Sequence, residues 1–98
     1  MDRNGYNPSI YPLGYCYICG CGGDLIRHEI FGGVSNRKKS KALGLWLNLC
    51  PACHSQIHHN PAQYRWLKAD AQTRAMELWQ WTEEDFISEF GKNYKEVE

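Results

Sequence analysis

The chain has 98 residues, and its 11 lysines and arginines balance its 11 aspartates and glutamates, so net charge alone does not indicate a polyanionic partner. A chain of this length is expected to form one small domain, and such domains often need a metal ion or disulfides for stability. The sequence contains no apolar run that could span a membrane and no signal peptide. In an intracellular chain, five cysteines that include two Cys-x-x-Cys pairs favour zinc over disulfides.

Residues 1–14 have the glycine, proline and asparagine content of a loop. Residues 15–23 then predict a tight knuckle, because Cys16 and Cys19 are spaced so that one turn aims both sulfurs at the same point. Gly20 gives that turn backbone freedom. Cys21 leaves two alternatives open, since it either replaces Cys19 as a ligand or is a spare thiol beneath the knuckle.

Residues 24–31 predict a strand that carries His28 and ends at two glycines. The next dozen residues predict a polar loop, and loops of this length are usually functional or disordered. Four basic side chains in this loop are candidates for contacts with a nucleic-acid backbone, or simply for solvation: Arg37, Lys38, Lys39 and Lys41. Residues 43–49 predict the return strand of a hairpin, which leads to Cys50.

A helix is expected from Pro51 until the pair Asn60–Pro61 interrupts it. A second helix of about 18 residues is predicted to follow, with an apolar face made of Tyr64, Leu67, Ala71, Ala75, Leu78 and Trp79. Thr82 and Asp85 nearly form a capping box, which starts a third helix. Its inward residues are expected to be Phe86, Ile87 and Phe90, and Gly91 is expected to end it.

Two groups of side chains have the spacing of metal ligands. The pairs Cys16/Cys19 and Cys50/Cys53 match a closed four-cysteine zinc site. His54 and His58 lie four residues apart, so they share one helix face and can bind one ion. Other interpretations are a zinc-ligand or supporting role for His54, a polar helix end for His58, and a half-buried structural role for His28.

Three segments together resemble the HNH endonucleases, also called His-Me finger or ββα-metal nucleases. These segments are CYIC (16–19), HEIFGG (28–33) and LCPACHSQIH (49–58). The run NRKKS after the glycines makes small phage-encoded HNH-type proteins the most similar group. The resemblance implies an α+β fold in one domain, residues 1–98. A zinc-stapled, treble-clef-like ββα-metal core would occupy residues 15–60, and two further helices would occupy residues 61–91.

The resemblance also implies a function. His28 would be the general base, and His54 and His58 would hold a catalytic divalent ion, Mg²⁺ or a transition metal. Asn36 would hold the loop that carries His28 through a side-chain hydrogen bond. The substrate would be DNA, contacted through its backbone with little sequence specificity. Such a phage or prophage protein would act in the cytoplasm of a bacterial host, as a homodimer or with a protein partner.

Two positions depart from the family pattern. Much of the family has Asp or His before the catalytic histidine, but here the residue is Arg27, which cannot bind a cation. Either Asp24 or Glu29 compensates, or water and phosphate complete the metal site, or the site is inactive. The middle asparagine is also uncertain, because Asn48 competes with Asn36. The alternative function is an inactive zinc module that binds nucleic acid or a protein.

Overall fold

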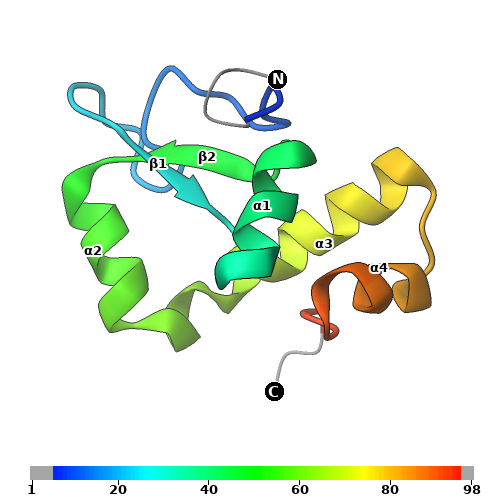
Figure 1. Ribbon diagram of the computed structural model, residues 1–98. Coiled ribbons are helices and arrows are strands. Elements are labelled where there is room, and N and C mark those ends of the chain that lie inside the picture. Colours follow the sequence, from blue (N-terminus) through cyan, green and yellow to red (C-terminus); the bar gives the residue numbers. More distant parts are fainter. Residues whose placement is uncertain (1–5, 96–98) are drawn as a thin grey trace.

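The computed structural model describes residues 6–95 (Figure 1). Residues 6–25 contain turns but no helix or strand, in agreement with the predicted loop and knuckle. The elements that follow are β1 (Ile26–Glu29), α1 (Val34–Ala42), β2 (Trp46–Leu49), α2 (Pro51–His59), the 3₁₀ turn η1 (Pro61–Tyr64), α3 (Arg65–Trp79) and α4 (Glu83–Phe90). The predicted α+β class is therefore confirmed. No helix in the described range is both long and apolar enough to cross a membrane.

The two strands form an antiparallel pair, as predicted. His28 lies opposite Leu47, and Ile26 lies opposite Leu49. The predicted first strand was longer than the observed one, because only residues 26–29 are paired. Leu47 and Leu49 are fully buried, so β2 supplies the apolar side of this small sheet and fixes the position of β1.

The connection between the strands is a helix, so the predicted loop is wrong. α1 was not recognised because its polar composition gives no apolar face, and Ser40 is its one buried residue. Arginine and lysine are nevertheless good helix formers when solvent covers their side chains. Ser40 attaches the helix to the end of the strand segment. Its Oγ accepts from the Phe31 N–H at 3.1 Å and donates to the Phe31 carbonyl at 3.2 Å.

α2 has the predicted start and end. Cys50 is its N-cap, Pro51 stands in the first turn, and Asn60 closes it. The predicted second helix begins with the turn η1 and continues as α3. Leu67, Ala71 and Ala75 are buried as expected, but Leu78 and Trp79 are 57% and 38% exposed, so the inward face predicted for the end of α3 is wrong.

α4 confirms the predicted capping box, in which Thr82 and Asp85 exchange side-chain and backbone hydrogen bonds. Gly91 ends the helix with a φ of 92°, a left-handed conformation that favours glycine. Phe86 and Phe90 are buried against Phe31, whereas Ile87 is 38% exposed and does not face inward as predicted.

The core lies where the sheet, α3 and α4 meet. In Figure 1, α3 runs beneath the strands from η1 to the far side of the molecule, and α4 turns back alongside it. Tyr11 closes the core from the amino-terminal segment, where it is buried and donates a hydrogen bond to Asp70 of α3 at 3.2 Å. In Figure 1, α2 also lies below the strands, and it contacts β1.

Candidate metal centres and groove

The knuckle brings several cysteines together. The sulfurs of Cys16, Cys19, Cys21 and Cys50 all lie within 4.8 Å of one another. The turn is closed by backbone hydrogen bonds from the Gly20 N–H to the Cys16 carbonyl and from the Cys16 N–H to the Cys21 carbonyl, both 2.8 Å long. All five cysteines of the chain are free thiols. Four converging thiols are a donor set that fits zinc.

The observed cluster does not contain the predicted fourth ligand. Cys53 was predicted from the repeated spacing, but the compact group contains Cys21 instead. Cys53 is nonetheless adjacent, because its N–H donates to the Cys50 sulfur at 3.5 Å, and its thiol also interacts with Cys16 and Cys19. The structure thus offers five thiols around one candidate zinc position.

Electrostatics in this cluster favour a bound cation. Burial alone would raise the pKa of Cys16, but backbone hydrogen bonds from residues 18, 19 and 50 lower it to about 6. Hydrogen bonds with Cys19 and Cys50 raise the pKa of Cys21 to about 12. Neighbouring thiolates repel one another, so ionisation of one thiol disfavours ionisation of the next in the metal-free cluster. A divalent ion would offset this repulsion.

A second cluster combines three histidines from two elements. Ligand nitrogens of His28, His54 and His58 lie within 4.8 Å of one another. The ring centroid of His28 is 5.5 Å from that of His54 and 6.2 Å from that of His58, and the two α2 rings are 4.7 Å apart. The fold explains this meeting, since β1 pairs with β2 and β2 leads through Cys50 into α2. The cluster fits a divalent ion bound by nitrogen.

The histidine cluster favours neutral imidazoles. Burial, followed by the proximity of His54 and His58, lowers the pKa of His28 to about 4. Burial and His58 also lower the pKa of His54. At neutral pH these rings keep a nitrogen lone pair, which can accept a proton or bind a metal ion.

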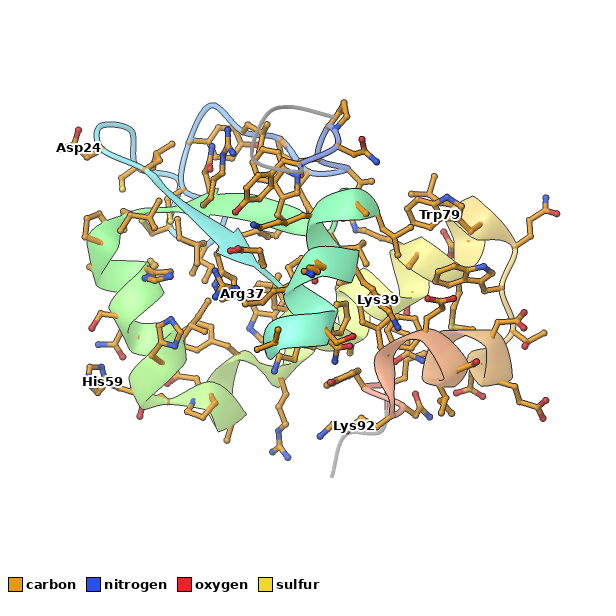
Figure 2. The ribbon with its side chains drawn as sticks, viewed as in Figure 1. Asp24, Arg37, Lys39, His59, Trp79 and Lys92 are labelled. Atoms are coloured by element: carbon orange, nitrogen blue, oxygen red, sulfur yellow. The ribbon has the colours of Figure 1, made fainter. Side chains whose placement is uncertain are left out.

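The histidines line a groove with a volume of about 900 Å³. Five cationic residues also line this groove, namely Arg27, Arg37, Arg65, Lys68 and Lys92. Figure 2 shows Arg37 between α1 and α2. Glu29 also lines the groove, but its carboxylate accepts hydrogen bonds from the Tyr6 hydroxyl at 3.0 Å and from Arg37 Nη2 at 3.2 Å. Burial by itself would raise the pKa of the Glu29 carboxyl, but these hydrogen bonds lower it.

The asparagines predicted for the catalytic site are elsewhere. Asn36 donates from Nδ2 to the Phe90 carbonyl at 3.1 Å, which ties α1 to α4, and it does not line the groove. The expected bond to the loop of His28 is therefore replaced by a helix–helix contact. Asn48 donates to the Leu13 carbonyl at 3.1 Å.

The predicted basic cluster is divided around α1. Arg37 reaches the groove and pairs with Glu29, whereas Lys39 pairs with Glu89 of α4 at 3.6 Å (Figure 2). Lys41 lies 4.9 Å from the centroid of the Tyr6 ring, and Lys38 is exposed. The groove cations Arg65, Lys68 and Lys92 were not among the predicted site residues, and no local motif marks them.

Arg27 does not join the histidine cluster. Its guanidinium lies 4.3 Å from the ring centroid of Tyr6 and 5.1 Å from that of Trp46. Neighbouring residues of a strand point to opposite faces, so Arg27 stacks on one side of β1 while His28 faces α2. Asp24, the other residue considered as a compensating ligand, stands at the tip of the loop before β1 (Figure 2).

No family model, curated protein or solved structure matches this chain. What the chain does must therefore follow from the chemistry of its two clusters and its groove.

Proposed function

We propose that the protein is a metal-dependent endonuclease that hydrolyses phosphodiester bonds of DNA. The observation that carries this proposal is the meeting of three histidines in a groove that is also lined by cationic residues. Phosphodiester hydrolysis needs a base, a cation beside the phosphate and a surface that accepts negative charge. The groove offers all three within one small space.

His28 would act as the general base. Because its pKa is lowered to about 4, the ring is neutral at physiological pH and can take a proton from a water molecule. His54 and His58 would hold Mg²⁺ or a transition-metal ion, which when bound stabilises the charge that develops on the phosphate. Arg27 does not obstruct this assignment, since it stacks on Tyr6 and Trp46 instead.

Zinc in the cysteine cluster would have a structural role. Cys50 is both a member of the cluster and the N-cap of α2. A zinc ion there would fix the start of α2 against the knuckle, and so keep His54 and His58 opposite His28. With β1, β2 and α2 around the two centres, we infer a treble-clef-like ββα-metal arrangement.

One observation favours a second function, an inactive zinc module that binds nucleic acid or a protein. The described histidine cluster contains no carboxylate, and Arg27 occupies a position where the family usually has a ligand. Metal stoichiometry separates the two functions. One tightly bound zinc alone supports the module, whereas zinc together with a more weakly bound second ion supports the enzyme.

The deciding experiment is nicking of supercoiled plasmid by the wild type and by His28→Ala, each loaded with zinc and supplied with Mg²⁺, Mn²⁺ or Ni²⁺. His59→Ala is the matched control, because His59 is on the same helix but bonds to the Ser55 carbonyl at 2.9 Å and points away from the groove (Figure 2). We expect EDTA-sensitive nicking that His28→Ala reduces at least about 100-fold and His59→Ala retains. A folded, zinc-loaded wild type without any nicking would favour the binding module.

A further inference from the structure

We propose that Lys68 and Lys92 bind the phosphate next to the one that is cut at the histidine cluster. The nucleic-acid strand would then run from α2 across the start of α3 to the segment after α4. This inference rests on the proposed nuclease function and identifies the residues that position its substrate.

The two lysines lie beside the same aromatic ring although they come from different elements. Lys68 is the fourth residue of α3, and Lys92 follows α4. Both line the groove, and both approach the same ring, since their Nζ atoms lie 5.5 Å and 5.0 Å from the ring centroid of Tyr94. Within residues 6–95, neither ammonium forms an ion pair with a carboxylate.

This pair of like charges favours an anion. Burial and, after it, the charge of Lys92 lower the pKa of Lys68, as expected where two like charges that line one groove repel each other. A phosphate between the two ammonium groups would relieve their repulsion. It would also replace the hydration that the Lys68 ammonium loses on burial. Phosphate contacts of this kind position a strand without reading its bases.

The segment that presents Lys92 is held firmly in place. Gln72, fully buried on α3, donates to the side chain of Asn93 at 2.8 Å and accepts from the Tyr94 N–H at 2.7 Å. The Tyr94 ring packs on Phe31 with a centroid distance of 4.8 Å. The backbone beside Lys92 is therefore positioned before a ligand arrives, which lowers the entropy cost of binding.

Two cationic side chains of α1 differ from Lys68 and Lys92, because they already form ion pairs. Arg37 pairs with Glu29 and Lys39 pairs with Glu89, so much of their charge is already compensated within the protein. The proposed nucleic-acid-binding surface therefore differs from the basic cluster at residues 37–41 that the sequence predicted.

The test uses zinc-loaded His28→Ala protein, so that a fluorescently labelled DNA oligonucleotide remains uncut while its Kd is measured over a series of salt concentrations. Single-stranded and duplex probes are compared. Lys68→Gln and Lys92→Gln are introduced separately, and Lys95→Gln, an exposed lysine outside the groove, is the charge-matched control. Each groove variant should reduce the slope of log K against log salt by about 1 and weaken binding several-fold at about 0.1 M salt, while Lys95→Gln changes neither.

Three outcomes would overturn the assignment. These are no binding of either probe, unchanged slopes for both groove variants, and an equal loss for Lys95→Gln. Lys38→Gln, at an exposed position of α1, is measured in the same way, and a loss confined to it would place the nucleic acid on α1 instead. The nuclease proposal fails separately, if the wild type does not nick DNA although binding still depends on Lys68 and Lys92.

Discussion

At the scale of single residues, the protonation state of His28 is set by its surroundings. Its pKa is about 4 in the folded protein, below the ordinary value of 6.5, because the ring is buried beside two other histidines. The unfolded chain therefore binds a proton at a higher pH than the folded one. The stability that His28 contributes is present above pH 6.5 and is lost as the pH falls towards 4.

This linkage predicts a difference between the wild type and His28→Gln. Between pH 7 and pH 5, the free energy of unfolding of the wild type should fall by about 2 kcal/mol more than that of the variant. Urea denaturation at both pH values, with zinc content checked in each sample, measures the difference. Parallel losses in the two proteins would show that His28 titrates normally in the folded state.

Gly44 is a position where the backbone permits only glycine. Its φ is 73°, and a Cβ atom there would overlap the backbone oxygen of Pro8. Gly44→Ala should therefore destabilise the protein by at least about 2 kcal/mol, because strain and overlap add. Gly14→Ala, at an open position without positive φ, should change stability by less than about 0.5 kcal/mol in the same thermal denaturation. Similar values for the two variants would contradict this account.

At the scale of elements, the Ser40 hydroxyl couples α1 to the segment that follows β1. Ser40→Ala would leave the buried N–H and carbonyl of Phe31 without this partner and should cost about 2 kcal/mol of stability. Ser35→Ala, at an exposed position of the same helix, is the control and should be nearly neutral. Denaturant midpoints measure both. A neutral Ser40→Ala would mean that the contact does not hold α1 in place.

The helices differ in how well local sequence marks them. α2 and α4 were predicted because Pro51, Thr82, Asp85 and Gly91 are start and stop signals that act within one turn. α1 has no side-chain N-cap to mark its start, and a contact between Ser40 and Phe31 that only the assembled fold makes ties it to the strand segment. The end of α3 was wrongly predicted to face inward. Periodicity identifies the apolar face of a helix, but it does not show how far along the helix other elements cover that face.

At the scale of the whole molecule, the cysteine cluster joins the knuckle to α2, so metal should decide whether the fold forms. Structural zinc contributes roughly 10–16 kcal/mol in small zinc-binding peptides, more than a core of this size supplies. Removing zinc with a strong chelator should therefore abolish the near-ultraviolet circular dichroism signal. His54→Ala/His58→Ala should keep zinc and fold, since its changes lie in the other cluster.

Serine variants of the cysteines test the same site further. Cys16→Ser and Cys50→Ser should lose zinc, whereas Cys21→Ser and Cys53→Ser should each retain about one ion, because five thiols surround one position. The double variant Cys21→Ser/Cys53→Ser should lose it. Mass spectrometry under native conditions gives the stoichiometry. Complete zinc loss from either single variant would identify that cysteine as an indispensable ligand.

The sequence by itself determined the ligand types, their spacing and most helix ends, because these depend on residues only a few positions apart. It indicated the Cys-x-x-Cys pairs, the histidine pair of α2 and the importance of His28. Only the tertiary structure decided that Cys21 joins the thiol cluster, that Asn36 contacts α4, and that Lys68 and Lys92 line the same groove as the histidines. Those relations join residues distant in the chain, so they exist only after the backbone has packed.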